Sequence, residues 1–104
     1  MISWDRVHEL RDEIGEEDFA EVAELFLTEV EEVIERLRAR PSPDTMEEDM
    51  HFLKGSALNL GFAALSRLCR DNERIAAEGR AGDVVLETVF QTYEASKEQF
   101  LAEA

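Results

Sequence analysis

Residues 44–61 read DTMEEDMHFLKGSALNLG, and the apolar residues of this stretch recur at intervals of three and four. On a helical wheel of 100° per residue, four of them fall within about 40° of a fifth, Met46. These five residues are Met46, Met50, Leu53, Ala57 and Leu60. The spacing predicts a helix that ends at Gly61 and turns one face toward a core.

The start of this helix is predicted near Asp44 or Thr45. Each of these residues has an acidic residue three positions later, Glu47 after Asp44 and Glu48 after Thr45. A polar side chain followed at that distance by a carboxylate is typical of a helix cap, and acidic residues favour the positive end of the helix dipole.

Four further segments repeat the helical spacing, at about residues 4–14, 18–40, 63–78 and from Asp83 onward. Proline disfavours helix in the residue before it, so residues 41–43 (PSP) end the second segment. Short connections imply antiparallel neighbours. We therefore expect an all-α protein, an antiparallel four-helix bundle with a short additional N-terminal helix, formed as a single domain by residues 1–104.

The same spacing predicts which residues are buried. In the segment at 18–40, the predicted stripe consists of Phe19, Val22, Phe26, Val30, Val33 and Leu37. In the last segment, it consists of Leu86, Val89, Phe90, Tyr93, Phe100 and Leu101. Cys69 lies on the apolar side of the segment at 63–78 and is expected to be a small core residue.

The composition restricts the classes of partner. The 104 residues include 25 acidic and 11 basic ones, a net charge of −14, which argues against binding nucleic acid or an anionic membrane through bulk charge. There is no apolar run long enough to span a membrane, and the single cysteine cannot form an internal disulfide. We expect a cytoplasmic protein that needs no second copy of itself to close its core.

The charge is unevenly spread along the chain. Residues 1–50 hold 17 acidic and 5 basic residues, whereas the segment at 63–78 carries Arg67, Arg70 and Arg74. Solubility and helix pairing account for such charges in most proteins, and partner selection is the alternative.

His51 lies about 140° from the start of the apolar stripe and therefore points to solvent from the middle of the helix. Its neighbours one turn later are Lys54 and Gly55. Glycine inside a helix costs about 0.5–1 kcal/mol relative to alanine, which suggests a need for open space beside the ring. Together the three residues indicate an exposed nucleophile that tolerates an attached anion.

Residues 51–61 (HFLKGSALNLG) resemble the signature of histidine-containing phosphotransfer (HPt) domains, His-x-Leu-Lys-Gly-Ser-(Ser or Ala)-x-x-(apolar)-Gly. The similarity continues into Leu68, Cys69, Glu73 and Gly79, and upstream into the first helices. One departure is Asn72, where the family usually has leucine. This departure places a polar group at the edge of the core or on a partner surface.

The resemblance implies that His51 accepts a phosphoryl group from the phospho-aspartate of a receiver domain, or from a sensor histidine kinase relay, and passes it to another receiver. Lys54 would offset part of the phosphate charge, and Gly55 would leave room for the partner. No cofactor is expected in this chain, because the receiver usually supplies the metal, Mg²⁺.

Partner contacts are expected on the surface around Lys54 and Gly55, with Leu58, Glu47 and Glu48 as the partner-binding residues. Glu47 and Glu48 lie four and three residues before His51, so either one can hydrogen-bond its second ring nitrogen. Simple stabilisation of the helix start is the alternative role for both glutamates. His8 lacks the Lys-Gly context and is interpreted as incidental.

Three functions remain open at this point. The leading one is a histidine phosphotransfer protein in two-component signalling. The second is an excised phosphoacceptor domain of a larger chemotaxis-type histidine kinase, and the third is a binding-only helical bundle that docks receivers without transfer. The sequence contains no glycine-rich phosphate loop, so we do not expect it to bind ATP or phosphorylate itself.

Overall fold

A computed structural model describes residues 1–103, and every regular element in that range is helical. The elements are α1 (Trp4–Ile14), α2 (Glu16–Ala39), α3 (Met46–Leu60), α4 (Ala63–Ala77), a short 3₁₀ helix η1 (Ala81–Asp83) and α5 (Leu86–Glu103). The all-helical prediction is confirmed.

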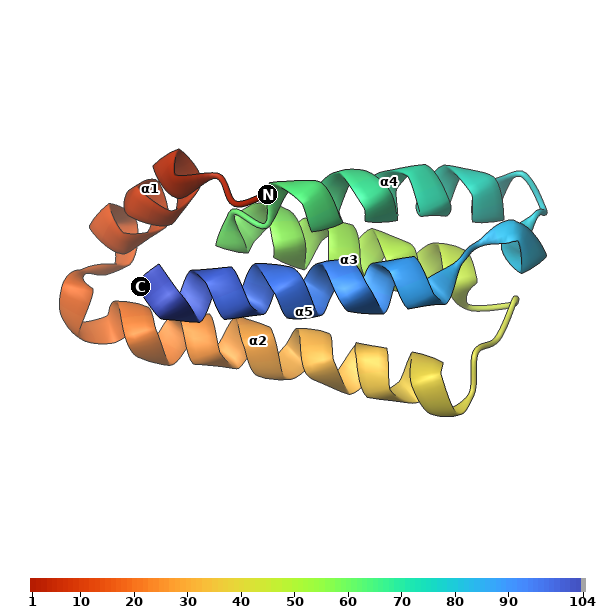
Figure 1. The fold of residues 1–104 in the computed structure, drawn as a ribbon, viewed down its shortest axis with the longest axis horizontal. Coiled ribbons are helices and arrows are strands. Elements are labelled where there is room, and N and C mark those ends of the chain that lie inside the picture. The colour runs from red at the N-terminus through yellow and green to blue at the C-terminus, as the bar shows by residue number, and fades with distance from the viewer. Residues whose placement is uncertain (104) are drawn as a thin grey trace.

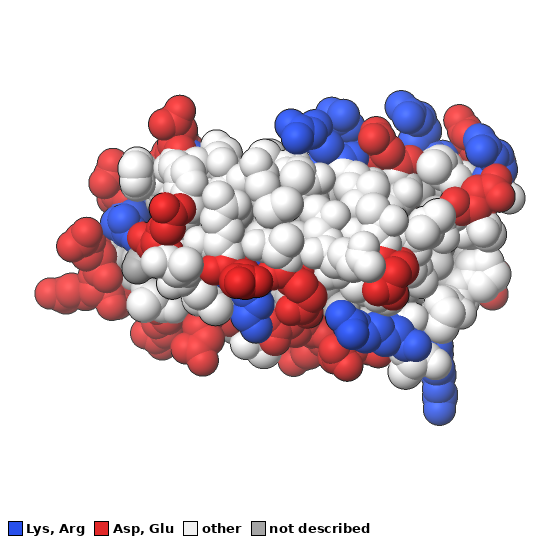
Figure 2. Space-filling model, in the orientation of Figure 1, with Lys and Arg blue, Asp and Glu red and all other residues white. Residues whose placement is uncertain are grey.

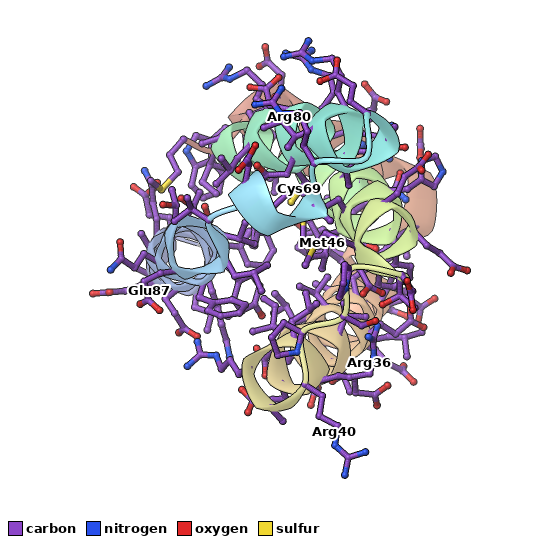
Figure 3. All side chains as sticks on the ribbon, turned by 90° about the vertical axis from the view of Figure 1, so that its right-hand side faces the viewer. Arg36, Arg40, Met46, Cys69, Arg80 and Glu87 are labelled. Atoms are coloured by element: carbon purple, nitrogen blue, oxygen red, sulfur yellow. The ribbon has the colours of Figure 1, made fainter. Side chains whose placement is uncertain are left out.

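The four longer helices, α2 to α5, lie along the long axis of an elongated molecule of 42 × 23 × 20 Å. In Figure 1 the chain reverses direction at each connection between them, while α1 lies at the end where α3 gives way to α4. In the end-on view of Figure 3, α3 lies between α2 and α4. One side of α3 therefore faces α2, another faces α4, and the outer side faces solvent.

The first residues of the chain hold the turn between α3 and α4. The Ser3 amide donates to the Gly61 carbonyl at 2.6 Å, and the Ala64 amide donates to the Met1 carbonyl at 3.2 Å. Gly61 has a φ of 82°, and a Cβ there would lie 2.7 Å from the Ser3 carbonyl oxygen. Only glycine fits this left-handed, crowded position, which is why α3 ends where the sequence predicted.

All five residues of the predicted α3 stripe are buried, so that prediction is confirmed. The largest fully buried side chains come from the α4 start and from α5: Phe62, Tyr93 and Phe100. The Phe62 and Phe100 rings meet edge to face, with centroids 5.5 Å apart. Cys69 is fully buried as well, and burial raises its thiol pKa to about 12, so it is an inert core residue.

The predicted stripe of α2 is partly wrong. Ala23, Leu27 and Ile34 are buried there, whereas their neighbours Val22, Phe26 and Val33 are only half-buried. Val22, Phe26 and Val33 each stand directly before an apolar residue in the sequence, so two overlapping stripes fit the helical spacing equally well. Packing against α3 and α5 selects the one that includes Ala23 and Ile34.

Several predicted boundaries also differ. Asp83 does not cap α5; it lies in η1, where its carboxylate accepts from the Arg80 guanidinium at 3.0 Å, and α5 begins at Leu86. Leu101 is exposed rather than part of the α5 core face. Thr45 precedes α3, but its hydroxyl donates to Asp49 instead of capping a backbone amide.

Asn72, the departure from the family pattern, is buried in α4, and its amide nitrogen has no hydrogen-bond partner among the described residues. The polar group thus lies inside the bundle and not on a partner surface. Within residues 1–103, no helix combines the length and the apolar character that a membrane crossing requires.

Candidate functional site

His51 stands on the outer side of α3, and 69% of its side chain is exposed. The buried stripe of the same helix holds α3 against the core, so the imidazole is presented to solvent by a fixed helical scaffold. The outward orientation predicted from the wheel is confirmed.

One carboxylate from α4 joins His51 and Lys54 of the motif. Glu73 Oε2 lies 2.8 Å from His51 Nδ1, and Glu73 Oε1 lies 2.6 Å from Lys54 Nζ. A second link between the helices lies about two turns earlier in α4, where the Ser66 hydroxyl donates to the Lys54 carbonyl at 3.3 Å. The ring is therefore held by a neighbouring helix as well as by its own.

The protonation of this cluster follows from its charges. Lys54 lowers the pKa of Glu73 by hydrogen bonding to it, and His51 lowers that pKa further, so the side chain is a carboxylate at neutral pH. A carboxylate only accepts hydrogen bonds, which assigns the proton of a neutral His51 ring to Nδ1. The lone pair then resides on Nε2, the nitrogen that Glu73 does not contact.

Gly55 follows His51 by one turn, and a Cβ built on it would meet no atom within 4 Å. Packing within this chain therefore does not require glycine at this position. Leu58, one turn further along the same face, has 63% of its surface exposed, and Phe52, the residue after His51, is exposed as well. The outer side of α3 thus combines open space with an apolar surface next to the ring.

The structure corrects the predicted partner of the ring. The hydrogen bond expected from Glu47 or Glu48 comes from Glu73 instead. Glu47 and Glu48 lie with Asp44 around a shallow hollow next to His51 and Glu73. Their role as partner contacts stays a prediction.

The sequence reasoning missed Glu73 as a functional residue because it is 22 positions from His51 and belongs to another helix. Spacing along one helix reveals only neighbours three and four residues away. The one available signal was that the family resemblance extends to this glutamate.

A second carboxylate anchors the side of α3 that faces α2. Asp49 is buried and accepts two hydrogen bonds from the Arg36 guanidinium of α2, at 2.5 and 3.2 Å, and one from the Thr45 hydroxyl at 3.0 Å. Figure 3 shows Arg36 extending from α2 on the side of α3. The two hydrogen bonds from Arg36 tie α3 to α2, and the Thr45 hydroxyl satisfies the same carboxylate from the start of α3 itself.

The structure therefore brings His51, Lys54, Gly55 and Leu58 onto one exposed surface, while His8 lies apart on α1. A family model described as Hpt domain matches residues 21–102, which include this entire surface. No curated protein and no solved structure matches the chain significantly. The chain belongs to the Hpt domain family, whose function is histidine phosphotransfer in two-component signalling.

Proposed function

We propose that this chain is a phosphoryl carrier in which His51 is the covalent site, receiving the phosphoryl group from one receiver aspartate or a kinase relay and passing it to another receiver. The observation that carries the proposal is the His51–Glu73 contact, which occupies Nδ1 and leaves Nε2 of an exposed ring available. In this function α2 to α5 act as an antiparallel four-helix bundle that supports the ring.

The transfer step needs no external proton. The Nε2 lone pair attacks the phosphorus of the phospho-aspartate, a nitrogen–phosphorus bond forms, and the aspartate carboxylate leaves with the electrons of the broken oxygen–phosphorus bond. The imidazole keeps its Nδ1 proton and becomes a cation. Glu73 is 2.8 Å from that nitrogen and stabilises the new positive charge, and the reverse step returns a neutral ring.

Lys54 supplies the balancing charge on the phosphoryl side. Its ammonium group lies 2.6 Å from the Glu73 carboxylate, which also contacts the His51 ring. Because the lysine side chain is flexible, a second N–H donor of the ammonium group can turn toward a phosphoryl group on Nε2. Gly55 leaves the adjacent surface open for a receiver to approach, and Leu58 provides an apolar contact. The Mg²⁺ ion of such transfers is expected on the receiver, not on this chain.

The test is incubation of the chain with a receiver domain phosphorylated by acetyl phosphate, followed by intact-mass measurement. Wild type is expected to gain one phosphate that is lost in acid, and His51→Gln to gain none. His8→Gln is the matched control, because it removes the other histidine and is expected to leave labelling unchanged.

The same experiment separates the carrier from a binding-only bundle. If the chain only docks receivers, wild type and His51→Gln would bind the receiver equally well, and neither protein would be labelled. Labelling that persists in His51→Gln would place the acceptor elsewhere and overturn the proposal.

A further inference from the structure

A row of arginines runs along the outer side of α4. Arg67, Arg70 and Arg74 are all exposed, and their charge contacts are loose: Arg70 and Arg74 each lie 3.8 Å from Asp71, and Arg67 forms no ion pair within residues 1–103. In Figure 2, blue atoms with a few red ones among them gather along the edge formed by α4, whereas red atoms predominate along the opposite edge, formed by α2. We call these three residues the α4 arginine row.

Most other basic side chains of the protein contact a carboxylate or an aromatic ring of the same chain. The basic side chains with close carboxylate partners are Arg6, Arg36, Lys54, Arg80 and Lys97. Arg11 and Arg38 lie over the rings of Phe19 and Phe90. In a protein of net charge −14, a row of three exposed cations that share one loosely placed carboxylate, Asp71, is a distinct local feature.

The row begins next to the functional site. Ser66 and Glu73 both contact α3, and Arg70 lies between them on the same stripe of α4, four residues after one and three before the other. Arg67 and Arg74 lie roughly 40–60° further from α3 by helical geometry. A partner that covers His51 therefore also reaches the row.

The opposite side of the ring has the opposite charge. Asp44, Glu47 and Glu48, at the start of α3, line the hollow beside His51 together with Glu73 of α4, whose charge is balanced by Lys54. The charge thus changes sign across the ring, from carboxylates at the beginning of α3 to guanidinium groups on α4. Such a gradient favours one orientation of a charged partner over the reverse.

We propose that this sign change orients the phosphorylated receiver domain, so that its carboxylate-rich side lies over the α4 arginine row; the inference rests on the proposed function. The incoming phosphoryl group is an anion, and the net charge of −14 opposes its approach. Screening limits the range of exposed charges to about 8 Å at physiological salt, so cations beside the ring outweigh distant carboxylates in the final approach.

The experiment measures the second-order rate constant of transfer from a phosphorylated receiver that labels wild type. Arg70→Gln combined with Arg74→Gln gives a net charge of −16, and so does the control Arg40→Glu, whose side chain points away from the bundle at the end of α2 (Figure 3). The double variant is expected to lose about three- to tenfold at low salt, and the control to lose less than about twofold.

Two further readouts decide whether the row acts in docking. The difference between wild type and the double variant is expected to vanish near 1 M salt, where the screening length is about 3 Å. The first-order rate at saturating receiver is expected to stay unchanged, because neither arginine touches the ring.

Three results would overturn the inference while leaving the proposed function intact. The first is an equal loss of the second-order rate constant in the double variant and in Arg40→Glu. The second is an unchanged second-order rate constant in the double variant. The third is a lower first-order rate of the double variant at saturating receiver. If no phosphorylated receiver labels wild type, the proposed function itself fails and the inference falls with it.

Discussion

Two carboxylates connect α3 to its neighbours, and they differ in what they hold. Asp49 faces α2, with 8% of its side chain exposed, and receives three hydrogen bonds from Arg36 and Thr45. Glu73 reaches α3 from α4, is 20% exposed, and contacts the exposed His51 ring and Lys54. The more buried carboxylate, Asp49, attaches a helix, whereas the more exposed one, Glu73, holds a reactive ring.

The comparison implies that the two sides of α3 can be altered separately. Changes on the side of Asp49 should lower stability and leave transfer intact. Changes around His51 should lower transfer and leave stability intact. Variants that lower stability and transfer together would show that the two sides of α3 are not independent.

The largest expected effect on stability is that of Asp49→Ala. Removing the carboxylate deletes charge-assisted hydrogen bonds at a buried position, so we expect the free energy of unfolding to fall by about 2 kcal/mol. Urea unfolding measures it, with Glu32→Ala on the exposed side of α2 as the control. A loss below about 0.5 kcal/mol, or slower transfer by the folded variant, would contradict the assignment.

Glu73→Gln is expected to have the converse effect. The amide keeps the shape of the side chain but no longer stabilises a charged ring, so transfer should slow by about tenfold, equivalent to ~1.4 kcal/mol. Stability should change by less than about 0.5 kcal/mol, because the ring and much of the surrounding surface are exposed.

Two measurements on Glu73→Gln check this expectation. Transfer kinetics give the rate, and ¹⁵N NMR of His51 reports which ring nitrogen carries the proton. Glu78→Gln, at the exposed end of α4, is the control. An unchanged proton position together with an unchanged rate would remove Glu73 from the site.

Leu58→Asp tests the apolar surface beside the ring. Because Leu58 is 63% exposed, we expect unfolding to change by less than about 0.5 kcal/mol while transfer weakens by roughly fivefold. Leu25→Asp is a closely matched control, since Leu25 is 58% exposed and lies on α2. Equal losses of transfer in both variants would show a general effect of charge and no docking contact.

Gly55→Ala should move stability and transfer in opposite directions. Alanine meets no atom within 4 Å and is the better helix former, so stability should rise by about 0.5–1 kcal/mol. Transfer should slow, because the added methyl group occupies space left for the receiver. Unchanged transfer would show that the glycine gives no clearance.

Much of α3 could be predicted from the sequence because its stripe of five apolar residues admits only one helical face. The outward direction of His51 follows from that stripe, and Gly61 marks the end of the helix because its backbone conformation excludes other residues. The α2 stripe was less determinate, since apolar residues stand side by side at positions 22–23, 26–27 and 33–34.

Contacts between helices were beyond reach from spacing alone. Glu73 meets His51 only because α4 packs beside α3, and Asp49 meets Arg36 only because α2 packs on the other side. Thr45 and Asp83 carry the residue types of helix caps, but each forms a side-chain contact instead. Local preference gives way there to a nearby charged partner.

Because α3 is attached to the rest of the molecule at both ends, residues that select the partner can change independently of the fold. Asp49 secures its beginning to Arg36 of α2, and Gly61 secures its end to the first residues of the chain. Residues on the outer side, such as Phe52 and Leu58, contribute little to either attachment. Evolution or engineering can therefore rewrite the recognition surface around His51 one residue at a time without displacing the ring.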